Sequence, residues 1–237
     1  MREMRRLFAI LPMLAALAFG FGGSASAVVG GAPDTTHVLV GAALQHQVQN
    51  GVSGNERCSG FLVSETKFVT AAHCFDPSGD PVRITFDADS RDPGAAFVEV
   101  PASSVVNSPD FDIAVITLPA QAGHMDIGSA ARLGSGDRVD VVGYGVQTIE
   151  HKVPTSFGRR MVASTRLAGD GKLDGLYLKL LADPGACLGD SGGPTLDASG
   201  NVVAITSFSN GNPNCNGVTY ALRLDNPGVQ AFLSAQT

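Results

Sequence analysis

Charged residues are scarce in this 237-residue sequence, and basic residues are fewer than acidic ones. Charged side chains make up 16% of the chain, with 16 Lys and Arg against 22 Asp and Glu, so the formal net charge is −6. Because nucleic-acid phosphates require a basic face, this balance argues against a nucleic-acid partner. With four cysteines and 44% hydrophobic residues over this length, the sequence is neither a small disulfide scaffold nor a disordered chain.

Long apolar runs are absent beyond the first residues of the chain. There, three arginines precede the apolar segment 7–21, and Ala25-Ser26-Ala27 provides the small residues that signal peptidase requires. The segment is shorter than the roughly 20 apolar residues of a bilayer span, so we expect residues 1–27 to be a cleaved signal peptide rather than an anchor. Arg5-Arg6 also fits a twin-arginine signal, which leaves the export route open. The protein is therefore expected to be secreted, with no membrane attachment after cleavage.

Regular helical patterning is also rare, whereas glycine (29 residues) and proline (13 residues) are abundant, which is typical of all-β folds with many turns. The one helix that the sequence predicts follows Asn226, because Pro227 suits a first helical position. Short apolar or alternating runs bounded by turn residues predict strands elsewhere. The predicted strands span residues 38–44, 82–86, 97–100, 113–118, 138–142, 161–167, 176–181, 202–208 and 218–224, and a further strand starts near Cys58.

Three local motifs carry the candidate chemistry, and they occur in the order His, Asp, Ser. They are Thr70-Ala71-Ala72-His73-Cys74, Asp112-Ile113-Ala114-Val115 and Gly189-Asp190-Ser191-Gly192-Gly193-Pro194. A lone histidine or aspartate is usually an ordinary surface or turn residue, but no packing requirement calls for a glycine-flanked polar serine. A serine hydroxyl needs an adjacent base to become a nucleophile, and a histidine oriented by a carboxylate provides one. The three motifs together predict nucleophilic acyl transfer.

The serine motif also fits the G-x-S-x-G turn of α/β-hydrolases, which is the main enzymatic alternative. In those enzymes the catalytic histidine follows the serine in the chain. None of the five histidines follows Ser191, because they stand at positions 37, 46, 73, 124 and 151. The lipase or esterase interpretation is therefore excluded.

The motifs resemble those of the chymotrypsin/trypsin family of secreted serine proteases. The resemblance extends from Val28-Val29-Gly30-Gly31 to the terminal helix, and it includes Val142-Gly143-Tyr144-Gly145, where Tyr replaces a family Trp. It implies an all-β fold of two antiparallel six-stranded β-barrels, with the active site between them and a short C-terminal helix. The protease domain would span residues 28–237, with barrel halves at about 28–125 and 126–237.

The same resemblance implies a role for each matching residue. His73 would be the base, Asp112 would orient it, Ser191 would be the nucleophile, and the backbone N–H groups of Gly189 and Ser191 would form the oxyanion hole. The ammonium group of Val28 would pair with Asp190, so activity would fall at alkaline pH as the amine loses its proton. Because the cleavage site directly precedes Val28, we expect signal peptidase itself to create the active terminus. The substrate pocket would include Gly185, Ser207, Phe208 and Ser209.

Four cysteines in an oxidising compartment should form two disulfides, and their spacing alone leaves three pairings open. The resemblance selects Cys58–Cys74 and Cys187–Cys215. No Cys/His group has zinc-site spacing, and the acidic residues 87, 89 and 92 match no calcium loop and are interpreted as a solvated turn. We therefore expect neither a metal nor a cofactor.

In the trypsin-like proteases that the sequence resembles, a carboxylate that binds Lys or Arg substrates stands six residues before the nucleophile. Here that position is Gly185, so the resemblance implies no preference for Lys or Arg. A small-to-medium apolar P1 residue is expected, with Ser209 narrowing the pocket mouth and either Gly217 or Val218 on the opposite wall. Partners would be protein or peptide substrates and protein protease inhibitors, and the chain would be a monomer. The alternative is a catalytically inactive homologue that acts as a binding protein.

Overall fold

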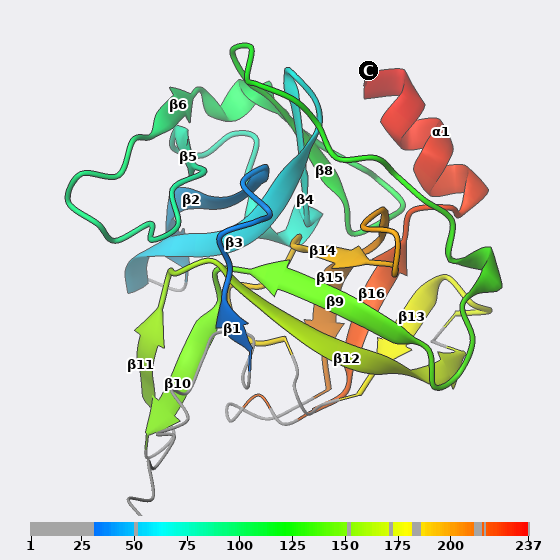
Figure 1. Ribbon diagram of the computed structural model, residues 1–237. Coiled ribbons are helices and arrows are strands. Elements are labelled where there is room, and N and C mark those ends of the chain that lie inside the picture. The colour runs from blue at the N-terminus through cyan, green and yellow to red at the C-terminus, as the bar shows by residue number, and fades with distance from the viewer. Residues whose placement is uncertain are drawn as a thin grey trace, which may run out of the picture.

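The structure is a computed structural model that describes residues 31–49, 52–150, 153–170, 173–181, 186–210, 215 and 217–236. Two antiparallel sheets dominate it, and both are strongly curled (Figure 1). The predicted signal peptide, Val28 and Gly185 lie outside the described residues. In the described part of the chain, no helix has the length and apolar character to cross a membrane.

The first sheet has the strand order β6-β5-β2-β3-β4-β8-β7. Residues 98–107 close it into a barrel, because their first part pairs with β5 and their last part with β8. Pro101, which lacks an N–H group, and the 3-10 helix η2 (Ala102–Ser104) divide this sixth barrel strand into β6 and β7. The strands are β2 (Val40–Gln49), β3 (Val52–Ser64), β4 (Lys67–Thr70), β5 (Val82–Thr85), β6 (Val98–Val100), β7 (Val105–Asn107) and β8 (Ala114–Thr117).

The second sheet also closes into a six-stranded ring, because β9 pairs with β14 on one side and with β12 on the other. The two-residue strand β1 adds to β12, which places the start of the described chain beside the second barrel. The strands are β1 (Ala32–Pro33), β9 (Arg138–Gly143), β12 (Met161–Asp170), β13 (Tyr177–Leu180), β14 (Pro194–Leu196), β15 (Val202–Ser209) and β16 (Thr219–Arg223). The predicted fold of two barrels is confirmed.

Few helices and one hairpin complete the fold. A hairpin of β10 (Val146–Glu150) and β11 (Val153–Phe157) extends from the second barrel, and residues 118–137, which include η3 (Ala130–Arg132), connect the two barrels. The helix α1 (Pro227–Gln236) is the predicted C-terminal helix, and the side chain of Asn226 accepts the N–H groups of Gly228 and Val229 at its start.

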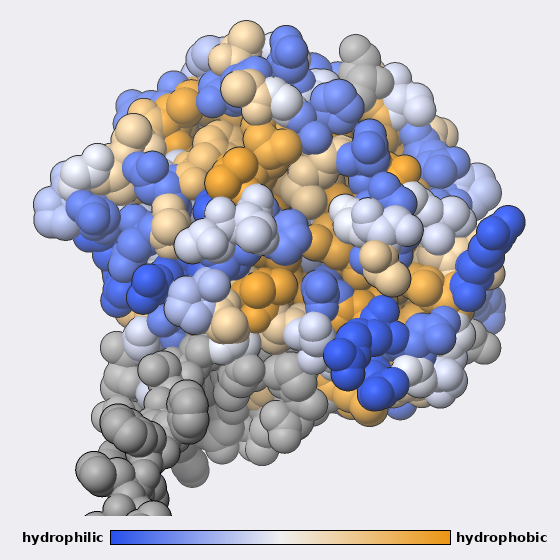
Figure 2. Space-filling model, in the orientation of Figure 1, coloured by the Kyte–Doolittle hydropathy of each residue, from blue (hydrophilic) through white to orange (hydrophobic). Residues whose placement is uncertain are grey.

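One continuous apolar cluster joins residues of both barrels and of α1. It includes Phe61 and Val69 of the first barrel, Leu222 of the second, and Val229 of α1, all buried completely. Figure 2 shows hydrophilic side chains mainly at the periphery of one face, with apolar side chains visible in the recesses between them. Burial of this shared cluster fixes the two barrels against each other.

A buried polar network also crosses the junction of the barrels. Nε of Arg160 lies 3.2 Å from Oδ2 of Asp34, and both residues are 3% exposed. The Arg160 guanidinium also donates to the backbone oxygens of Val40 and Phe86 and to the hydroxyl of Tyr144. Burial raises the pKa of Asp34, but hydrogen bonds from His37 and Thr36 outweigh this effect and hold the pKa well below its ordinary value.

The ion pair therefore links the start of the described chain to both barrels. Because the lowered pKa of Asp34 favours the carboxylate in the folded protein, its contribution to stability is present above the unfolded-state pKa and is lost as the pH falls below it.

Replacing Arg160→Met should lower the free energy of unfolding by about 3–5 kcal/mol, because the buried Asp34 carboxylate loses its cation. The matched control is Arg83→Met, which removes the exposed pair of Arg83 with Glu99 at 3.9 Å and should cost about 1 kcal/mol or less. Urea unfolding at neutral pH measures both. Equal losses in the two variants would contradict the role assigned to the buried pair.

Candidate active site

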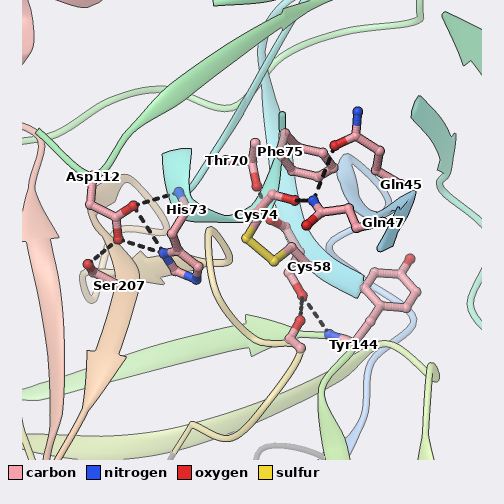
Figure 3. The surroundings of a disulfide bond; sticks show 12 residues. Gln45, Gln47, Cys58, Thr70, His73, Cys74, Phe75, Asp112, Tyr144 and Ser207 are labelled. Atoms are coloured by element: carbon pink, nitrogen blue, oxygen red, sulfur yellow. Dashed lines mark hydrogen bonds and ion pairs between the residues drawn. A yellow bond between two sulfur atoms is a disulfide. The ribbon is translucent and has the colours of Figure 1, made fainter. Parts of the chain in front are cut away.

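His73 and Asp112 meet at one end of the first barrel, as the sequence motifs predict. His73 lies in η1 (Ala72–Cys74), directly after β4, and Asp112 lies just before β8. Nδ1 of His73 is 3.0 and 2.9 Å from the two carboxylate oxygens of Asp112, and the backbone N–H of His73 donates to Oδ1 (Figure 3). This double contact fixes the imidazole through Nδ1, so Nε2 is the ring nitrogen that can accept and return a proton.

Asp112 has a third partner in the second barrel. The hydroxyl of Ser207, on β15, donates to Oδ2 of Asp112, as Figure 3 shows. Burial raises the pKa of Asp112, but the hydrogen bond and charge of His73, helped by Ser207, lower it below its ordinary value. Sequence reasoning assigned Ser207 to the substrate pocket, where it also lies, and missed this contact because it joins residues 95 positions apart.

Ser191 stands in a glycine-rich loop whose backbone needs glycine at two positions. Gly189 and Gly192 have φ angles of +94° and +80°, in the left-handed region. A Cβ on Gly192 would lie 2.4 Å from the backbone oxygen of Ser59 and 2.6 Å from the backbone nitrogen of Ala71, so this loop packs tightly against the first barrel. The loop thereby brings Ser191 to the cavity that His73 also lines.

Asp190, the residue before Ser191, is completely buried, is not among the lining residues of that cavity, and has its carboxyl group against Gly143 and Gly145. Its carboxylate accepts the backbone N–H of Gly145 at 2.8 Å and that of Cys187 at 2.9 Å. Burial raises its pKa to about 7, and these two hydrogen bonds only partly oppose the effect. A Cβ on Gly143 or Gly145 would lie 2.2 to 2.5 Å from this carboxyl group, which explains the two glycines around Tyr144.

Both disulfides pair as the family resemblance implies. Cys58–Cys74 joins β3 to the histidine segment, and Cys187–Cys215 joins the serine loop to the segment before β16 (Figure 3 shows the first). Among the described residues, one cluster of metal-ligand types occurs, formed by Cys58, Cys74 and His73. Both of its sulfurs belong to the disulfide, so they are not thiolate ligands.

The cavity beside Ser191 has a volume of about 420 Å³. Ser207, Phe208 and Ser209 line it as predicted, whereas the predicted pocket residue Gly185 lies outside the described residues. Thr219 lines the cavity, whereas neither Gly217 nor Val218, which the sequence suggested for the opposite wall, is among its described lining residues. Sequence reasoning also missed the remaining lining residues, which are Ala186, Cys187, Leu188, Thr206 and Cys215. The described lining residues include no carboxylate, and His73 is the one basic residue among them.

Aromatic packing supports one side of this cavity. The ring of Phe208 stacks on Tyr220, with centroids 4.9 Å apart, and meets Tyr177 edge-on at 5.2 Å. Phe208 is 38% exposed, so it presents an apolar surface to the cavity while its neighbours hold it in place.

A fold of two barrels, with histidine and aspartate on one and serine on the other, defines the class of trypsin-like serine protease domains. The family model named Trypsin matches residues 28–226, and the chain belongs to this family. Among solved structures, human heparin binding protein has the same fold, with a TM-score of 0.66, 19% sequence identity and coverage of 88% of this chain and 96% of the other. No curated protein sequence matches the chain.

Replacing Ser207→Ala should raise the pKa of Asp112, because the carboxylate loses a hydrogen-bond donor that favours its charged form. The control is Ser209→Ala, since the Ser209 hydroxyl lines the same cavity but bonds to the backbone oxygen of Val218. A carbon-13 NMR titration of the carboxyl groups reports both. An unchanged Asp112 titration in Ser207→Ala would show that this contact has no electrostatic effect.

Proposed function

We propose that the protein is a secreted serine endopeptidase that hydrolyses peptide bonds through an acyl-enzyme on Ser191. The observation that carries this proposal is the contact of both Asp112 oxygens with Nδ1 of His73, on the cavity that Ser191 also lines. Membership of the trypsin family supports the same reaction class.

In the proposed reaction, Nε2 of His73 takes the proton of Ser191 as Oγ attacks the substrate carbonyl carbon. A C–O bond forms, and the negative charge moves to the former carbonyl oxygen. The histidine then gives the proton to the leaving amine as the C–N bond breaks, and water repeats the sequence to release the acid. Asp112 stabilises the imidazolium that exists between the two proton transfers.

The negative oxygen would be held by the N–H groups of Gly189 and Ser191. Backbone donors fixed in place before the reaction stabilise developing charge without reorganisation, and loss of one such donor in related enzymes costs about 10²–10³ in turnover. The left-handed φ of Gly189 supports this assignment, because a side chain at that position would be strained.

Activation would require a cation beside Asp190. A buried carboxylate without an opposite charge is unfavourable, as the raised pKa of Asp190 indicates. The α-ammonium of Val28, freed by signal peptidase, is the proposed partner, and the two disulfides agree with an oxidising extracellular destination. Protein substrates and protein inhibitors are the expected partners of the monomeric domain.

The alternative function is that of an inactive homologue that binds other molecules. The structural neighbour is named for binding heparin rather than for an enzymatic activity, and its 19% identity supports a shared fold alone. Heparin is polyanionic, whereas this chain carries a formal net charge of −6, so the charge balance does not favour that ligand. The presence of His73, Asp112 and Ser191 together favours the enzyme.

A fluorophosphonate probe separates the two functions, because it reacts with a serine only when a base activates the hydroxyl. Folded protein should be labelled at Ser191, and Ser191→Ala and urea-unfolded protein should remain unlabelled. Ser191→Ala should also lower turnover of peptide substrates by about 10⁶-fold, the scale found for another triad protease. A folded wild-type protein that resists the probe would favour the inactive binding protein.

The cavity favours a small-to-medium apolar P1 side chain, because its described lining offers no carboxylate to a Lys or Arg residue. Cleavage of a peptide library that varies only at P1 should therefore give kcat/KM at least tenfold higher for apolar residues than for Lys or Arg. A strong preference for Lys or Arg would overturn this specificity while leaving the protease assignment intact.

A further inference from the structure

Ser59 of β3 is a completely buried serine whose hydroxyl connects the two barrels. Its Oγ accepts the backbone N–H of Tyr144 at 2.8 Å and donates to the backbone oxygen of Gly189, also at 2.8 Å. The backbone N–H of Ser59 also donates to the oxygen of Ser191 at 2.8 Å. One residue of the first barrel therefore holds the loop of the second barrel that carries the nucleophile.

The other side of this loop is held by the residues that follow Tyr144. The N–H of Gly145 donates to the Asp190 carboxylate, and the N–H of Val146 donates to the backbone oxygen of Leu188 at 2.8 Å. In a trans peptide the C=O and N–H groups point in opposite directions. The bond from Val146 to Leu188 thus turns the N–H of Gly189 away from Val146. The backbone N–H groups of Tyr144, Gly145 and Val146 therefore orient the loop, and that of Tyr144 acts through the Ser59 hydroxyl.

Gly189 cannot hold this orientation by itself. Its φ angle is +94°, and it has no side chain whose packing could hold the backbone in that conformation. Glycine also moves between backbone conformations more freely than any other residue. The hydrogen bond from Ser59 fixes the carbonyl of Gly189, while that from Val146 fixes the carbonyl of Leu188. Both peptide groups that flank the Gly189 Cα are thereby restrained.

The donor side of the bridge is itself rigid. The Tyr144 side chain is 0% exposed. Its hydroxyl accepts from Arg160 and lies 2.8 Å from the backbone oxygen of Asp87 and 3.1 Å from that of Val40, between which its single hydrogen can be donated. The Tyr144 N–H that Ser59 accepts therefore belongs to a residue that is held in place at the junction of the barrels.

We propose that Ser59 is a positioning residue for the oxyanion hole: its hydroxyl fixes the carbonyl of the Gly189–Asp190 peptide. This limits rotation about the Gly189 Cα and so keeps the Gly189 N–H, which the bond from Val146 to Leu188 orients, directed at the substrate oxygen. This inference rests on the proposed function, since it assigns a role in the same reaction. Ser59 touches neither the substrate nor His73 in this role, and it acts through Gly189.

The test compares Ser59→Ala with a matched variant, Ser90→Ala. Ser90 is also a buried serine of the first half of the chain: its hydroxyl accepts from Arg57 and donates to the backbone oxygen of Gly158 at 2.9 Å, in the second half. Both substitutions remove a hydroxyl that bridges the halves, but only Ser59 contacts the serine loop. Thermal unfolding should show similar losses of stability in the two variants.

Ser59→Ala should lower kcat for a good peptide substrate by about 10- to 100-fold, with KM within about threefold of the wild type, because a misplaced oxyanion donor acts mainly on the transition state. Affinity for a peptide aldehyde, whose adduct with the nucleophile carries an oxyanion, should fall by a similar factor. Ser90→Ala should keep kcat within twofold. If Ser59→Ala does not fold, Ser59→Gly provides the same comparison. A kcat loss no larger than that of Ser90→Ala overturns the proposal.

Hydrogen exchange separates this proposal from the proposed function. If the wild-type protein neither hydrolyses peptides nor reacts with the fluorophosphonate, the proposed function fails. The orientation of the loop is then tested by exchange of the Gly189 and Asp190 amides. Faster exchange in Ser59→Ala than in Ser90→Ala supports the restraint, and equal exchange in the two variants contradicts it.

Discussion

The proposed catalytic arrangement depends on one constraint: the glycine-rich loop that carries Ser191 must pack against β3 of the other barrel. His73 and Asp112 come from the first barrel and Ser191 from the second, so their relative positions are only as fixed as that contact. The bond from the Ser59 N–H to the Ser191 oxygen, and the absence of any side chain at Gly192, allow the two backbones to approach closely. Packing of the apolar cluster that the two barrels share then keeps the serine loop and β3 at this short distance.

Much of the fold could be predicted from sequence because most strands are short alternating runs between turn residues. The nine predicted runs all correspond to strands, and the helix begins at the predicted Pro227. The sequence did not reveal β4, β14 or the hairpin of β10 and β11. Length is not the reason, since β5 and β6 have four and three residues and were predicted. β4 ends in the histidine motif and β14 begins in the serine motif, so neither stands as a separate run between turn residues. The sequence also did not show that β6 and β7 are two parts of one barrel strand interrupted at Pro101. That relation becomes visible only in the closed barrel, where β6 pairs with β5 and β7 pairs with β8.

The candidate site shows the same difference between local and distant signals. His73, Asp112 and Ser191 could be found because each stands in a characteristic local motif. Ser59, in contrast, meets Gly189 across 130 positions, and its own neighbours contain no pattern that indicates a partner. Contacts of this kind arise only when two barrels close and dock. They are a property of the tertiary structure rather than of any segment.

The buried pair of Asp34 and Arg160 has a consequence for how this sequence can diverge. Loss of the arginine alone leaves a buried carboxylate without this cation. Loss of the aspartate alone leaves a buried guanidinium whose remaining partners are backbone oxygens and a tyrosine hydroxyl. Each single step is unfavourable, whereas exchange of both for apolar residues of similar volume is not. The two positions should therefore covary among relatives, as a charged pair or as an apolar pair, although they lie 126 positions apart in the chain.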